Sequence, residues 1–219
     1  MVVGLTFAVL MESQSETNRV LSGAEGLFMR YGIKSVTMDD VARELGVSKK
    51  TLYLHVDNKA DLIRKIIVAH ISAEKAAMAE IVKSSDDAID EMMKVARYML
   101  RLLRQISPNL IYDLRKYHSD SWTLLESLHK GYMYDLIRGN LERGVSQGLY
   151  RADLDPDIIA RLYVGKSRVV VDEDIFPLDT YKREHLYAIS MEYHIRGVAS
   201  SRGLERLTSW KEINPDNRM

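Results

Sequence analysis

The chain has 219 residues, of which 46% are hydrophobic and 28% are charged; this composition is typical of globular proteins and excludes a chain that is disordered throughout. Because 31 basic side chains balance 31 acidic ones, any binding of nucleic acid must come from a local basic patch. The chain has no cysteine, which excludes disulfides, thiolate zinc sites and cysteine nucleophiles. With four prolines and 12 glycines there is room for long helices, so we expect an all-α fold.

Residues 1–11 form an apolar stretch, but no basic region precedes it and no small-x-small cleavage pattern follows it, so the signal-peptide pattern is incomplete. No other segment approaches the ~18 apolar residues that span a bilayer. We therefore expect residues 1–15 to be a variable N-terminal extension. We also expect a cytoplasmic protein without a membrane partner.

The N-terminal part of the chain predicts three closely spaced helices. The first runs from Glu16, with apolar residues at three- and four-residue spacing, to a stop at Gly32. Thr37 then provides an N-cap oxygen, and acids in the following turn suit the positive end of the helix dipole. This second helix must end at Gly46, because Ser48 caps another helix two residues later. The pattern predicts two short helices joined by a tight glycine turn.

Longer helices are predicted in the rest of the chain. Their apolar periodicity and capping residues place them at residues 59–82, 89–103, 110–117, 121–141, 156–171 and 180–200. Residues 169–171 could equally form a short strand. The polar tail at residues 211–219 is expected to fray.

Residues 38–56 carry the most informative pattern. Ala42 is small enough for two helices to cross closely, Gly46 follows four residues later at the turn, and apolar residues on both sides fix the pair. Such a helix-turn-helix leaves the N-terminal side chains of its second helix free to enter a major groove of DNA. Between Gly46 and Val56 the chain has two lysines, one histidine and no acid, which gives a local positive face. The alternative is an ordinary helix pair with a solvated basic face.

At these residues the chain resembles a known family. The matching motifs are Ala24-x-x-Leu27-Phe28-x-x-Tyr31-Gly32, Thr37-Met38-x-x-Val41-Ala42-x-x-Leu45-Gly46-Val47-Ser48 and Thr51-Leu52-Tyr53-x-His55-Val56-x-x-Lys59-x-x-Leu62. Through them the stretch from about Glu16 to Ile67 resembles the TetR (tetracycline repressor) family of transcription regulators. The rest is similar only in helix count, apart from residues 194–199, which look like the end of the family's last dimerisation helix.

The resemblance implies a domain organisation and partners. It implies an all-α chain with a three-helix DNA-binding domain at residues 16–60 and a larger effector-binding and dimerisation domain at residues 61–210. The chain would bind a palindromic double-stranded DNA operator as a homodimer, most often as a repressor, and a small-molecule effector would release it. No metal or other cofactor is expected.

The resemblance also implies which residues touch DNA. They are Thr37, Ser48, Lys49, Lys50, Thr51, Tyr53, His55 and Lys59. Thr37 and Lys59 would meet phosphates, whereas Lys49, Lys50 and Thr51 would face base edges, and Tyr53 and His55 would contact backbone or bases. Lys50 departs from the family, where this position is often small; a long cation can select guanine or sit on a phosphate. Leu54 and Val56 stand where the family often has aromatic residues.

An aromatic cluster between Tyr112 and Tyr134 could line a mostly apolar pocket. The alternative is that these aromatic residues belong to the core. The predicted effector-binding residues are Met92, Met99, Tyr112, Tyr117, Trp122 and Tyr132. Because these helices offer methionine, leucine and aromatic side chains, we expect an apolar or aromatic effector. The dimer is expected to form through the last two long helices, at Ile158, Leu162, Leu186, Ile189, Tyr193 and Gly197.

Three other patterns suggest different chemistry. Residues 144–148 match the G-x-S-x-G elbow of hydrolases, which needs a strand before the serine, whereas a helix is predicted there. The six histidines lack the i, i+4 spacing of a helical metal site. The acidic run at residues 172–174 is more typical of a solvated loop. The alternative functions are a helical enzyme or carrier with an incidental helix pair, and a helical adaptor without a ligand.

Overall fold

The computed structural model describes the backbone of residues 2–107, 109–170, 172–177 and 179–213, and the side chains of these residues except 2–14, 129 and 211–213. Most of the described residues are helical and none of them forms a strand, which confirms the all-α fold. No helix among them is long and apolar enough to cross a membrane.

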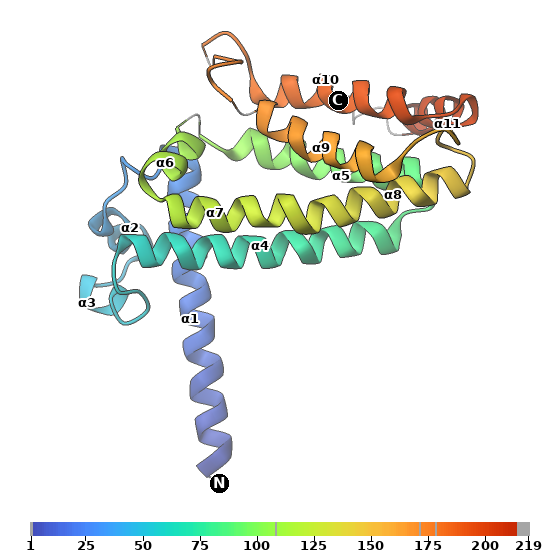
Figure 1. Cartoon of the computed structure of the whole chain (residues 1–219). Helices are drawn as coiled ribbons and strands as arrows, with labels where there is room; N and C mark the ends of the chain where they lie inside the picture. Colours follow the sequence, from blue (N-terminus) through green and yellow to red (C-terminus); the bar gives the residue numbers. More distant parts are fainter. Residues whose placement is uncertain (1, 108, 171, 178, 214–219) are drawn as a thin grey trace. The chain divides into compact units, whose positions relative to one another are not determined.

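Twelve helical elements follow one another in the described residues (Figure 1). They are α1 (Val2–Tyr31), α2 (Met38–Leu45), α3 (Lys49–Leu52), α4 (Lys59–Ser84), α5 (Ala88–Gln105), α6 (Leu110–Tyr117), α7 (Ser119–Leu128), the π-helical turn η1 (His129–Met133), α8 (Tyr134–Ser146), α9 (Pro156–Val170), α10 (Arg183–Val198) and α11 (Ser201–Ile213). Val171 and residues 214–219, for which we predicted a strand end and part of a tail, lie outside the described residues.

The chain divides into two compact units. Unit 1 holds the residues up to Ile71 together with Ile106–Leu125, and unit 2 holds Ser72–Gln105 and the residues from Glu126 onward. Helices α4 and α7 each contribute to both units. The sequence-based boundary near residue 60 assigned α6 to the effector domain, whereas the structure groups α6 with the N-terminal helices.

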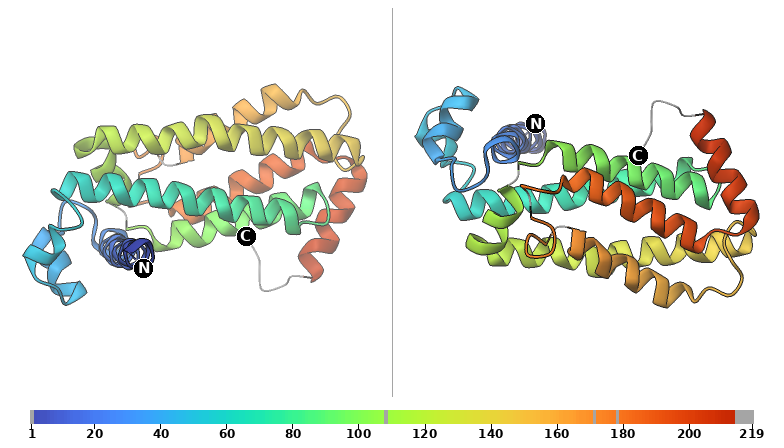
Figure 2. Two further views of the ribbon diagram at one scale, coloured as in Figure 1. Left: turned by 90° about the horizontal axis from the view of Figure 1, so that it is seen from below. Right: turned by 90° about the horizontal axis from the view of Figure 1, so that it is seen from above.

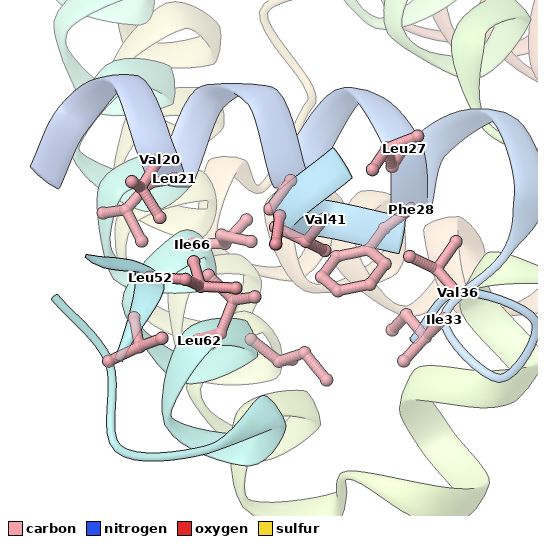
Figure 3. Close-up of a cluster of buried hydrophobic side chains, with 14 of the residues drawn as sticks. Val20, Leu21, Leu27, Phe28, Ile33, Val36, Val41, Leu52, Leu62 and Ile66 are labelled. Atoms are coloured by element: carbon pink, nitrogen blue, oxygen red, sulfur yellow. The ribbon is translucent and has the colours of Figure 1, made fainter. Parts of the chain in front are cut away.

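Unit 1 is built around one apolar core. Ala24 and Phe28 of α1, Val41 of α2, Leu52 of α3 and Leu62 of α4 are all buried in it. Figure 3 shows the side chains of the last four turned toward one another from their separate helices. Because residues from four helices share this core, even the four-residue helix α3 is held in place by packing.

In unit 2, α5 contacts α8, α10 and α11, and α9 packs against α8 and α10 (Figure 2). Tyr150 connects α5 and α8: its hydroxyl lies 3.0 Å from the Ala88 carbonyl and 2.9 Å from Asn140 Oδ1. The Tyr150 ring fills the space beside Gly144, where a Cβ atom would lie only 2.0 Å from Tyr150 Cδ2. This glycine is therefore required by packing.

The structure confirms one local expectation and adds one helix that was not predicted. Gly144 and Ser146 lie in the last turns of α8, and no strand precedes them, so the described backbone lacks the geometry of a hydrolase elbow. Helix α11 was not predicted; Ser200 caps it by accepting a hydrogen bond from the Gly203 N–H at 3.1 Å. Its Leu207 and Trp210 are buried, which anchors the helix.

Candidate DNA-binding face and effector region

Thr37 begins α2 through a reciprocal pair of hydrogen bonds. Its hydroxyl accepts a bond from the Asp40 N–H at 3.2 Å, and the Asp40 carboxylate accepts one from the Thr37 N–H at 2.8 Å. The Thr37 hydroxyl also donates to this carboxylate at 2.6 Å. The bond from the hydroxyl first, and then the bond from the Thr37 N–H, hold the pKa of Asp40 below its usual value. The cap thus occupies the hydroxyl that the resemblance places against a phosphate.

The turn between α2 and α3 presents the start of α3 to solvent. Gly46 ends α2 with a φ of 66°, a left-handed conformation that suits glycine. Ser48 then caps α3 by accepting a bond from the Thr51 N–H at 3.0 Å. Leu52 is fully buried and fixes α3 to the core. The structure therefore brings together on one short segment five predicted DNA-binding residues, Ser48, Lys49, Lys50, Thr51 and Tyr53.

The two lysines of this segment differ in their partners. Lys49 Nζ lies 2.5 Å from Asp39 Oδ1, and both side chains are more than half exposed. An exposed ion pair of this kind contributes little to stability, so Lys49 can exchange Asp39 for a phosphate. Lys50 forms no ion pair with any described residue and is exposed. Beside them Tyr53 is also exposed, so cationic and aromatic groups share one surface.

His55 and Lys59 are turned toward the interior of unit 1. The His55 side chain is only 9% exposed, and its Nδ1 lies 3.0 Å from Thr17 Oγ1 on α1. The Lys59 ammonium donates hydrogen bonds of 2.6 Å to the carbonyls of Ile33 and Val36, and burial lowers the pKa of Lys59. Both groups thus bind other segments of unit 1 at positions where we expected DNA contacts.

The predicted effector-binding residues are divided between the two units. Tyr112 and Tyr117 are exposed on α6 in unit 1, and Trp122 packs against the core of the same unit. Met92, Met99 and Tyr132 belong to unit 2, where Met92 is buried and the Tyr132 hydroxyl donates to the Lys75 carbonyl at 3.1 Å. Two open hollows contain none of these residues. The hollow of about 400 Å³ is lined by Leu27, Tyr31, Ser35, Val36, Asp40, Arg43 and Glu44. The hollow of about 560 Å³ is lined by Asp87, Gln147, Leu149, Arg202 and Arg206.

A different set of buried polar groups lies between α9 and α10. The hydroxyls of Tyr163 and Tyr187 are 3.4 Å apart, and Tyr163 Oη also lies 3.4 Å from the Met191 sulfur. His194 packs edge-on against the Tyr163 ring, with 4.9 Å between centroids. Its side chain is 8% exposed, and its Nε2 has no hydrogen-bond partner among the described residues. Such a buried, unsatisfied nitrogen is unusual.

Charge and burial keep this cluster neutral. Burial, together with the nearby Lys166, lowers the pKa of His194 to about 3, and burial raises the pKa values of both tyrosines. Burial also lowers the pKa of Lys166 to about 8, and its amine donates to the Ser190 carbonyl at 2.8 Å. Sequence analysis missed the cluster, because aromatic residues and histidine at helical spacing match the pattern of an ordinary core.

Helices α9 and α10 also carry large apolar side chains that remain exposed. Ile158 and Leu162 lie one turn apart on α9, and Ile189 and Tyr193 lie one turn apart on α10; Leu162 is 62% exposed and Tyr193 is 79% exposed. Leu186 is half-buried and Gly197 is exposed. Solvent-exposed apolar patches of this kind mark interaction surfaces.

These features define a class of protein. A helix-turn-helix with basic and aromatic side chains exposed at its second helix, followed by a larger helical unit, is the architecture of DNA-binding transcription regulators.

Comparisons with known proteins support this class. Residues 20–66 match the family model described as "Bacterial regulatory proteins, tetR family". The chain is 27% identical over 163 residues to YvaF of Bacillus subtilis, an uncharacterized HTH-type transcriptional regulator, with 73% of this chain and 83% of YvaF covered. It is 25% identical over 166 residues to the HTH-type transcriptional repressor KstR2 of Rhodococcus jostii, with 69% and 76% covered.

The fold agrees with the sequence matches. A transcriptional regulator of the TetR family from Agrobacterium tumefaciens superimposes with a TM-score of 0.69 at 16% identity, over 86% of this chain and all of that one. The resemblance to the TetR family is therefore confirmed, and the chain is a transcriptional regulator of the TetR type.

Proposed function

We propose that this regulator binds a palindromic operator in double-stranded DNA as a homodimer and acts in the cytoplasm as a repressor. The observation that carries the proposal is the segment Ser48–Tyr53, which holds the exposed cation Lys50 and the exposed ring of Tyr53 on a capped helix. A lysine at the start of a recognition helix can reach guanine O6 and N7 in the major groove. Similarity to the KstR2 repressor supports repression.

The exposed apolar surface of α9 and α10 supports the homodimer. A second copy of the chain could cover this surface with the same residues, so that no other protein is needed to remove them from water. The residues concerned are Ile158, Leu162, Ile189 and Tyr193. Gly197 is open to solvent, and no atom lies within 4 Å of a Cβ built there. A glycine at this position would allow close approach of two helix ends.

We further propose that the effector binds in unit 2 at the cluster of Tyr163, Tyr187 and His194. The neutral imidazole and two phenolic hydroxyls offer hydrogen bonds to an uncharged polar group, such as a hydroxyl or a carbonyl. The Met191 sulfur lies 3.4 Å from the Tyr163 hydroxyl and adds an apolar side chain, and the Lys166 ammonium lies 5.3 Å from the centroid of the Tyr163 ring. An apolar or aromatic molecule with one such polar group therefore suits the site.

Selection of bound duplexes from a random pool tests the DNA-binding proposal. The purified protein should enrich a palindromic sequence, and Lys50→Ala and Tyr53→Ala should each weaken binding to that sequence by ~1 to 3 kcal/mol if they read bases. Lys83→Ala is the matched control, since Lys83 is exposed on α4 and forms no ion pair among the described residues. A pool without enrichment, or full affinity in both variants, would contradict the proposed role of α3.

A further inference from the structure

Two tyrosines and two lysines form an exposed cluster in unit 1 outside the helix-turn-helix. On α6, the Lys116 ammonium donates to the Tyr112 hydroxyl at 2.6 Å and lies 5.5 Å from the centroid of the Tyr117 ring. Lys34, from the segment between α1 and α2, places its ammonium 5.5 Å from the same centroid. We call these four residues the tyrosine–lysine patch. The Tyr117 ring thus contacts two cations, and this ring is 46% exposed.

A buried hydrogen bond holds the two halves of the patch together. Asp113 of α6 is 4% exposed, and its carboxylate accepts a bond from the Lys34 N–H at 2.8 Å. Gly32, with a φ of 80°, allows the chain to turn into this contact, and its Cα is so close that a Cβ there would lie 3.2 Å from Asp113 Oδ2. The position of Lys34 relative to α6 is therefore fixed by its backbone.

The patch has excess positive charge. Neither Lys34 nor Lys116 forms an ion pair with any described residue, and the Asp113 carboxylate, which accepts from the Lys34 N–H, is buried. The Tyr112 hydroxyl raises the pKa of Lys116, so its amine is protonated at neutral pH. Arg115 on the same helix is also exposed. Two unneutralised cations next to phenolic hydroxyls match the acceptor oxygens of a phosphate.

The patch is continuous along the chain with the proposed DNA-binding surface. Lys34 lies three residues before Thr37, the N-cap of α2 at the start of the helix-turn-helix. We propose that the tyrosine–lysine patch binds a phosphate of the operator backbone, so that Lys34, Lys116 and Tyr117 extend the DNA contact beyond the helix-turn-helix. This inference rests on the proposed DNA-binding function. Because phosphate contacts carry no sequence information, the patch would raise the affinity for DNA without selecting a sequence.

The salt dependence of binding tests the inference. Lys34→Ala, Lys116→Ala and the control Lys83→Ala would be titrated with the selected operator duplex and with a scrambled duplex of equal length, from 50 to 200 mM salt. Each phosphate contact contributes about 0.9 to the slope of log K against log salt, so one contact per subunit contributes about 1.8 in a dimer. Over this fourfold salt range the wild type should lose about 12-fold more affinity than either patch variant.

The outcomes separate this inference from the proposed function. The inference is supported if both patch variants weaken binding to both duplexes by the same factor and flatten the slope, while Lys83→Ala does neither. If the patch variants keep the wild-type slope on the operator, the inference is overturned and operator binding stands. If the wild type binds neither duplex, both are overturned. Because the altered side chains are exposed, unfolding midpoints should remain unchanged, and a lowered midpoint with an unchanged slope would also overturn the inference.

Discussion

Replacing Lys59 by methionine separates two roles for this residue. The family resemblance places Lys59 on a DNA phosphate, whereas the structure shows its ammonium donating to the Ile33 and Val36 carbonyls at 2.6 Å. Hydrogen bonds from a charged group each contribute ~1.5 to 3 kcal/mol. Part of this gain is offset by desolvation, which also lowers the pKa of the amine. We expect Lys59→Met to lower the free energy of unfolding by about 2 kcal/mol.

Urea denaturation at fixed protein concentration measures this loss, because a dimer's stability depends on concentration. Lys83→Met, which removes an exposed lysine of the same helix, should leave the unfolding midpoint unchanged. On the selected operator, the Lys59 variant should retain the salt slope of the wild type. Unchanged stability together with a slope reduced by about 2 per dimer would refute the structural role and favour the phosphate contact.

Three further predictions follow from packing, exposure and charge. Gly144→Ala should destabilise unit 2 and lower the melting temperature, because the new Cβ would overlap the buried Tyr150 ring; an unchanged melting temperature would show that the ring can move aside. Ile189→Glu should give monomers in sedimentation velocity and abolish operator binding; dimers of wild-type affinity would refute the proposed interface. Because burial lowers the pKa of Lys166 to about 8 in the folded state, against about 10.4 when unfolded, its contribution to stability should rise with pH between these values. The difference in urea midpoint between wild type and Lys166→Met, measured from pH 7.5 to 10, should therefore shift in favour of the wild type as pH rises, and a constant difference would contradict the lowered pKa.

Local signals in the sequence were sufficient to predict the helix-turn-helix. Thr37 and Ser48 cap the helices as expected, and Gly46 has the left-handed conformation that ends α2. These features depend on hydrogen bonds between residues three or four positions apart, so both partners of each bond lie within the same short stretch of sequence. The exposed apolar positions on α9 and α10 were also identifiable, because apolar residues there exceed those needed for one buried stripe.

Contacts between distant residues could not be predicted in this way. The packing of α6 in unit 1 includes the bond between the Lys34 N–H and Asp113, which are 79 positions apart, and the burial of Leu114 in the unit 1 core. His55 lies in a basic segment typical of DNA contact, yet its partner Thr17 is 38 positions away on α1. The aromatic cluster near Tyr112 and Tyr132 was continuous in sequence, but the structure divides it between two units.

Hydroxyl-radical footprinting of the full-length protein on its selected duplex tests the central claim that a dimer inserts two copies of α3 into successive major grooves. We predict two symmetric protected segments on one face of the DNA, with centres about one helical turn (~34 to 36 Å) or a multiple of it apart. The Ile189→Glu variant should lose both segments at the same protein concentration. A single protected segment for the wild type, or the same two segments for the Ile189 variant, would contradict the account.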